Sequence, residues 1–254
     1  MPAEALKRYE EKVLLWKVMQ VLVENDGQLE GSDIVNKAVR KILSPESEEV
    51  KDAPEAFATG AQLVGMAPTS GSQVQADPVD PKSVDELRTY LAKGDRKGAV
   101  WHAVDQRLWA HAMLISSTLD RDVWKQVAQE FVRQEVKKLG DNTQPLAALY
   151  EIFAGNLEES VDQLVPASAR AGFQMVSKAE GIGSTKNTLE GLDRWRETLV
   201  LILSNRSDND VQALLALGGL LAGYGRVEAA HICYLFARSV VYLGGADDQQ
   251  ASMV

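Results

Sequence analysis

The residue types that could perform chemistry are few in this sequence, and their spacing does not group them. The only histidines are His102, His111 and His231, and neither His102 nor His111 has another histidine or a cysteine at the spacing of metal ligands. The single cysteine, Cys233, lies in an apolar run with no lysine or arginine within one helical turn to stabilise a thiolate. We expect the histidines to be packing or surface residues and Cys233 to be a buried, inert thiol.

Three polar stretches resemble ligand-binding loops only superficially. Gly181–Lys186 reads GIGSTK, whereas a phosphate loop needs a glycine directly before Lys-Ser/Thr and a preceding strand. Asn205–Asp208 and Asp247–Asp248 lack the alternating oxygen ligands and closing glutamate of a calcium loop. The sequence therefore predicts no catalytic residue, cofactor or metal site. A helical hydrolase or transferase would need a pocket of perturbed acids or bases, which no group of residues predicts, so we expect a protein that is not an enzyme.

Composition and charge narrow the remaining function classes. The chain has 254 residues, of which 45% are hydrophobic and 25% charged, as in ordinary globular proteins. Its net charge of −9 argues against nucleic-acid binding, which needs a basic face. Charges throughout the first 20 residues break up any signal peptide, and no apolar run is long enough to span a membrane. We expect a cytosolic protein whose contact with membranes is indirect.

The elements that position these residues are helices. Apolar residues recur at helical spacing, capping residues and glycine or proline stops separate the segments, and no segment alternates with period two. The predicted helices are Ala3–Glu24, Ser32–Leu43, a helix starting at Ser83, a pair after Gly94, Asp120–Leu139, Pro145–Phe153, Asn156–Val165, Ser168–Ala179, Thr188–Ser204, one starting at Asp208, and Arg226–Leu243. Glu46–Lys82, rich in proline and small polar residues, is predicted to be a disordered loop.

The predicted helices have the pattern of a stack. Gly94–Val136 combines a tight turn with small residues on one helix and large ones on the next, which lets the helices pack closely. A similar turn and helix recur at Gly225–Ala230, but without a strict period. The sequence therefore predicts one all-α domain over residues 1–254, an irregular α-solenoid of about a dozen helices. The five tryptophans all fall on predicted helices, and we expect each in the core or as a wedge between helices, with one or two left as candidate interface anchors: Trp16, Trp101, Trp109, Trp124 and Trp195.

Four blocks of the sequence carry a family likeness. They are Leu15–Val35, Leu91–Ser116, Asp193–Asn205 and Gly225–Ala237, in this order and with a variable loop at 46–82. Together they resemble the central conserved domain of the Sec16 family, the COPII scaffolds of endoplasmic-reticulum exit sites. The resemblance implies an ancestral coatomer element, in which the helices run outward, reverse at a crown and return along themselves.

The resemblance also implies function and partners. It implies a non-enzymatic scaffold that organises COPII coat assembly and vesicle budding through protein–protein contacts at the cytosolic face of the endoplasmic reticulum. The alternative is a structural cage or nuclear-pore subunit of the same fold. Family members bind the propeller protein Sec13 through a β-blade that precedes the first helix, and this sequence shows no such blade. The family also pairs through its crown, so we expect a homodimer whose surface lies in Pro145–Ala179 and includes Leu149, Tyr150 and Phe153.

Overall fold

A computed structural model describes residues 3–45, 80–140, 142–165, 190–241 and 244. Within these ranges the regular structure is entirely helical, with twelve α-helices and one short 3₁₀-helix, so the all-α prediction is confirmed. The helices are α1 (Ala3–Glu24), α2 (Asp33–Leu43), α3 (Pro81–Ala92), α4 (Arg96–Asp105), α5 (Trp109–Ser116), α6 (Arg121–Gln134), η2 (Val136–Leu139), α7 (Gln144–Ala154), α8 (Leu157–Leu164), α11 (Glu190–Asp193), α12 (Trp195–Ser204), α13 (Asp210–Gly223) and α14 (Val227–Phe236).

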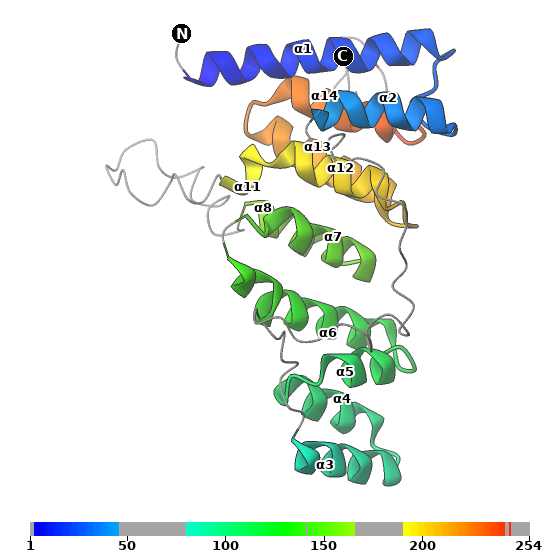
Figure 1. The fold of residues 1–254 in the computed structure, drawn as a ribbon, viewed down its shortest axis with the longest axis vertical. Helices are drawn as coiled ribbons and strands as arrows, with labels where there is room; N and C mark the ends of the chain where they lie inside the picture. Colours follow the sequence, from blue (N-terminus) through cyan, green and yellow to red (C-terminus); the bar gives the residue numbers. More distant parts are fainter. Residues whose placement is uncertain (1–2, 46–79, 141, 166–189, 242–243, 245–254) are drawn as a thin grey trace, which may run out of the picture.

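The helices form an elongated stack that folds back on itself (Figure 1). Helices α1 and α2 lie at one end of the stack and α3 lies at the other, and the chain then climbs back from α3 to α14. At the end of this path α14 packs against α1, and α12 packs against α2. The first and last described helices therefore share one end of the molecule, as the expected return of the solenoid requires.

Buried apolar side chains gather in three separate clusters along the stack. The lower cluster joins α3, α4, α5 and α6, and a small middle cluster joins α6, η2 and α7. The large upper cluster holds side chains of α1, α2, α7, α8, α12, α13 and α14, with the fully buried Trp195 among them. Since α6 and α7 alone connect the lower and upper clusters through the middle one, the stack is a series of bodies joined end to end.

The two predicted turns before the small-residue helices have the expected backbone. Gly94 and Gly225 adopt left-handed φ angles of +75° and +74°, which favour glycine. Asp95 then caps α4, because its Oδ1 accepts a hydrogen bond from the Gly98 amide at 2.8 Å. Arg226 occupies the same place before α14 but makes no capping bond, and its side chain serves another purpose described below.

Several predicted helix boundaries are wrong, and only the first of them, the start of α3, has a purely local cause. Helix α3 starts earlier than predicted, since Asp80 is its N-cap and Pro81 takes the first turn, which places Ser83 inside the helix and buries it. The 80–82 part of the predicted loop is thus the helix start. The predicted Asp120–Leu139 helix breaks at Glu135, where η2 begins after α6.

The later part of the chain is also divided differently from the prediction. The predicted Thr188–Ser204 helix is two helices, α11 and α12, divided at Arg194. Helix α13 begins at Asp210, two residues after the predicted start, and α14 ends at Phe236, well before Leu243. The remainder of the predicted loop, at 46–79, and the predicted Ser168–Ala179 helix lie outside the described residues.

Candidate interaction surfaces

The residues whose side chains could take part in a reaction or bind a metal lie apart from one another. His102 Nε2 lies 3.1 Å from the Ser83 carbonyl oxygen, and the ring is tilted against Tyr90. His111 is exposed and His231 is half-buried on α14. Cys233 is fully buried, as predicted, and burial raises the pKa of its thiol. Across the described ranges no three histidine, cysteine, aspartate or glutamate side chains are grouped so that they could hold a metal ion. Gly181–Lys186 and Asp247–Asp248 lie outside these ranges.

The sequence did not predict the buried acidic side chain of Glu151. Glu151, on α7, is fully buried, and its Oε2 accepts a hydrogen bond from Asn156 Nδ2 at 2.8 Å. The same Asn156 amide donates to the Lys125 carbonyl oxygen of α6 at 3.0 Å, so it ties α6 to the α7–α8 turn instead of capping α8. Burial raises the pKa of Glu151 above its usual value, and the Asn156 hydrogen bond opposes that rise. This arrangement is a polar joint between α6 and the α7–α8 turn.

A second polar cluster closes the solenoid at the end where α1 lies. Arg226 Nε donates to Glu11 Oε1 at 2.7 Å, and both side chains are largely buried. Arg226 Nη1 also donates to the Leu192 carbonyl oxygen at 3.0 Å and to Asp193 Oδ1 at 3.1 Å. Lys7 adds a 2.7 Å ion pair to Asp193. These bonds fix α1, α11 and α14 to one another, so this cluster is structural.

The structure separates the three residues predicted for self-association. Leu149 is only 5% exposed, so the prediction that it lies on the surface is wrong. Tyr150 is half-buried and lies 6.1 Å from Phe131 between ring centroids, and Phe153 is 44% exposed. Leu149 is buried because apolar residues surround α7 on nearly every side and neighbouring helices cover most of them. Of the three residues, Phe153 and the half-buried Tyr150 can still contribute to a self-association surface.

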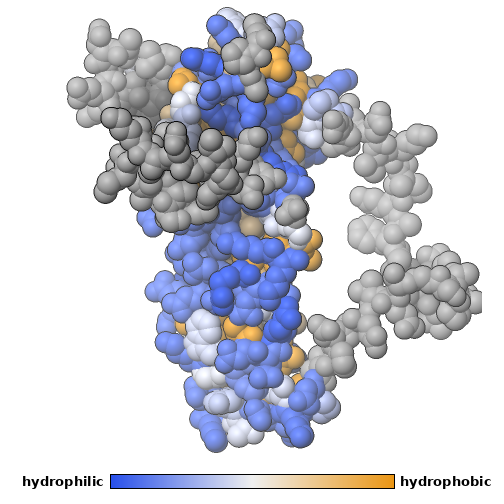
Figure 2. Space-filling view, turned by 90° about the vertical axis from the view of Figure 1, so that its left-hand side faces the viewer, coloured by the Kyte–Doolittle hydropathy of each residue, from blue (hydrophilic) through white to orange (hydrophobic). Residues whose placement is uncertain are grey.

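The outward side of α1 is the larger apolar surface, and it was missed. Leu6, Tyr9, Trp16 and Val23 are 48%, 60%, 63% and 77% exposed. The prediction that Trp16 lies in the core is therefore wrong, whereas Trp195 is buried as expected. The other three tryptophans are half-buried: Trp101, Trp109 and Trp124. Figure 2 shows apolar patches that interrupt a mainly hydrophilic surface along the stack.

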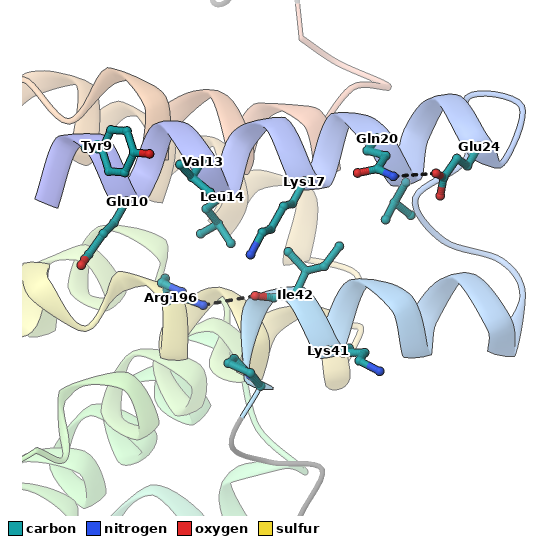
Figure 3. Close-up of a pocket in the computed structure, with 12 residues that line it drawn as sticks. Tyr9, Glu10, Val13, Leu14, Lys17, Gln20, Glu24, Lys41, Ile42 and Arg196 are labelled. Atoms are coloured by element: carbon teal, nitrogen blue, oxygen red, sulfur yellow. Dashed lines mark hydrogen bonds between the residues drawn. The ribbon is translucent and has the colours of Figure 1, made fainter. Parts of the chain in front are cut away.

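A groove runs between α1 and α2 beside this surface (Figure 3). Its volume is about 790 Å³, and its walls carry Val13, Leu14 and Lys17 from α1 and Ile42 from α2. Arg196 of α12 closes its floor, where Nη2 donates to the Ile42 and Leu43 carbonyl oxygens at 3.2 and 2.8 Å. The groove is open, and charged side chains line it from both helices, with Glu10 and Lys17 on α1 and Lys41 on α2.

Known proteins resemble this chain in sequence over practically its whole length. The family described as "Sec16 Sec23-binding domain" matches residues 87–254. A protein named COPII coat assembly protein SEC16 from Phaeosphaeria nodorum is 57% identical over 251 residues, which is 99% of this chain and 14% of that protein. The protein named COPII coat assembly protein sec16 from Aspergillus niger is 57% identical over 254 residues, which is 100% of this chain and 13% of that protein. The chain thus spans about one seventh of the length of these relatives.

The fold has a counterpart among solved structures. A chain of the Sec13/Sec16 complex from S. cerevisiae superposes with a TM-score of 0.59, covering 94% of this chain and 56% of that chain. The sequence identity is 17%, so this likeness concerns the fold alone. Among the helices that the structure describes, none is both long and apolar enough to cross a membrane. The match over residues 87–254 and the 57% identity across the chain show that it belongs to the Sec16 family.

Proposed function

We propose that the chain is a helical scaffold segment for COPII coat assembly, acting through protein–protein contacts at the cytosolic face of endoplasmic-reticulum exit sites. The observation that carries this proposal is the 57% identity, over practically the whole chain, to proteins named for COPII coat assembly. The geometry agrees with it, since the described polar clusters are joints between helices and the exposed features are apolar surfaces.

The mechanism is the presentation of binding surfaces on a stable support. Buried clusters and the Arg226 ion pairs hold the stack in one shape, which keeps its surfaces at fixed separations. In a longer protein, a support of this kind raises the local concentration of whatever binds beside it, so that several weak contacts act together. The net charge of −9 disfavours nucleic acid as a partner and disfavours direct binding to anionic lipid, so contact with the membrane runs through other proteins.

The proposed partners are coat proteins, with the Sec13 propeller and Sec23 as the first to test, because these names occur in the matched complex and family. The purified chain should retain Sec23 or Sec13 from a mixture of purified coat subunits and should retain no nuclear-pore subunit added as a competitor. Retention of the nuclear-pore subunit alone would favour the alternative reading, a nuclear-pore scaffold. Retention of neither coat protein would contradict the proposal for this segment.

Self-association through α7 is part of the same proposal. Phe153 supplies exposed apolar area, and Tyr150 continues it toward Phe131. We expect Phe153→Asp to lower the average mass in sedimentation at micromolar concentration, because a charge would then lie in the contact. Leu114→Asp is the matched control, since Leu114 is exposed on α5, which lies farther down the stack than α6 and α7 (Figure 1). An identical mass for the wild type and the Phe153 variant would rule out this surface.

A further inference from the structure

Helix α1 carries a second apolar stripe, which borders the α1–α2 groove on one side and reaches the outward surface at Trp16 and Val23. This outer stripe consists of Leu6, Tyr9, Val13, Trp16, Gln20 and Val23. The spacing alternates between three and four residues, which is the heptad pattern of a coiled-coil seam. At 3.6 residues per turn, the centre of the outer stripe lies roughly 140° around the helix from the buried stripe of Leu14, Val18 and Val21. A surface helix needs only one apolar stripe, so the second one calls for a partner.

The contacts of α1 leave the outer stripe uncovered by the described part of the chain. The ion pairs of α1 start from Lys7, Arg8 and Glu11, which lie between the two stripes or on the buried side and bind α11 and α14. Trp16 and Val23 expose more than half of their surface, and so does Tyr9, which lines the groove between α1 and α2 (Figure 3). An apolar seam several turns long on a well-anchored helix is preformed for another helix.

The outer stripe is complementary to itself when two copies of α1 run antiparallel. A two-fold axis midway between Val13 and Trp16 places Leu6 opposite Val23 of a second copy. The same axis places Tyr9 opposite Gln20 and Val13 opposite Trp16. Each contact occurs twice, as a two-fold interface requires. The seam's amide residue, Gln20, then faces the Tyr9 hydroxyl, which can hydrogen-bond with it.

The charges beside the seam select the same arrangement. Glu10 and Lys17 follow Tyr9 and Trp16 directly, so they flank the seam on one side, and both are exposed. Neither has an ion-pair partner among the described residues. In the antiparallel pairing Glu10 of each copy meets Lys17 of the other, which gives two attractive contacts. A parallel pairing would instead bring Lys12 of one copy against Lys17 of the other, which is repulsive.

We propose that α1 binds α1 of a second copy of this chain as an antiparallel helix pair, through the outer stripe and two Glu10–Lys17 ion pairs. This contact goes beyond the proposed coat function and is separate from the α7 surface. A chain with both contacts could bind one copy at α7 and a different copy at α1, so pairs would extend into longer assemblies.

Charge reversal tests the pairing in the whole chain. The dimer dissociation constant is measured by sedimentation equilibrium in the Phe153→Asp background, so that the α7 contact does not contribute. We expect Glu10→Lys or Lys17→Glu to weaken the dimer about fivefold, because two surface ion pairs are lost. The double reversal should restore the wild-type value. Trp16→Ala should weaken the dimer by roughly a hundredfold or more. Ile34→Ala, an exposed α2 control, should change nothing.

A cross-link tests the geometry independently. Cysteines placed by Glu10→Cys and Lys17→Cys lie about 10 Å apart along one helix, too far for a disulfide within one chain. Mild oxidation should therefore give a disulfide-linked dimer through both pairs, and the buried Cys233 should not interfere. Failure of the double reversal to restore association, or absence of the cross-linked dimer, overturns the proposal. The proposal is also overturned if Trp16→Ala weakens the binding of Sec13 or another protein but leaves the average mass of the chain alone unchanged.

Discussion

Replacing Arg226 by methionine should weaken the attachment of α1 to α11 and α14 and lower the free energy of unfolding. The substitution keeps much of the aliphatic stem but removes the bonds to Glu11, Leu192 and Asp193. Glu11 is only 5% exposed, so its carboxylate would stay buried without its cation. Removing one partner of a buried pair costs about 3–5 kcal/mol of unfolding free energy, and we expect a loss in that range.

A double-mutant cycle in urea, followed by circular dichroism, provides the test. Glu11→Leu combined with Arg226→Met should recover most of the loss, because two apolar side chains of similar size replace the buried pair. Arg133→Met is the control, since Arg133 forms an exposed pair with Glu130 and should leave the midpoint unchanged. Two results would refute the argument that Arg226 closes the stack. One is an unfolding free energy for Arg226→Met as close to the wild type as that of Arg133→Met. The other is a double variant whose loss equals the sum of the losses of Glu11→Leu and Arg226→Met.

Three further predictions concern buried positions. The raised pKa of Glu151 means that folding favours its protonated form, so the free energy of unfolding falls as the pH rises through that pKa. In denaturant titrations, the Glu151→Gln variant should therefore have the same free energy of unfolding as the wild type in acid and a higher one at neutral pH. Gly218→Ala should lower the free energy of unfolding by about 1–3 kcal/mol in the same assay, because the added Cβ would lie 2.3 Å from Tyr234 Cε1. Gly219→Ala, with open space around it, should instead stabilise the helix slightly. Cys233 should react with a thiol reagent only at the rate of unfolding, because it is buried.

Helical periodicity predicted most of the fold, because it records which residues must avoid water. It gave the bounds of α1 correctly and the all-α class, since long amphipathic segments leave little choice of structure. The α3 start failed because of the local Asp80 cap and Pro81, whereas the break at Glu135 lies beside a tertiary contact. At Glu135 the carboxylate binds Arg107 at 2.7 Å and Trp109 Nε1 at 2.8 Å, and the helix breaks at that residue. Such partners are distant in sequence and leave no local signal.

The surfaces were harder to predict than the core. Helix α7 is apolar nearly all round, so its sequence could not say that Leu149 faces inward and Phe153 outward. Helix α1 raised the opposite difficulty, because its two stripes merged into one broad apolar face and Trp16 was assigned to the core. Reading the heptad spacing of 6, 9, 13 and 16 separately would have found the outer stripe. The Glu151 joint could be suspected only from a lone acid among apolar neighbours.

The return of the chain to its starting layer has a consequence for biosynthesis. Helix α1 emerges from the ribosome first, but α14, which covers its inner face, follows about 200 residues later. At common translation rates the inner face of α1 waits roughly 10–40 s for its cover. During that interval Leu14, Val18 and Val21 remain available to chaperones or to neighbouring nascent chains. The lower helices, whose contacts are local, can complete their cluster while α1 is still waiting.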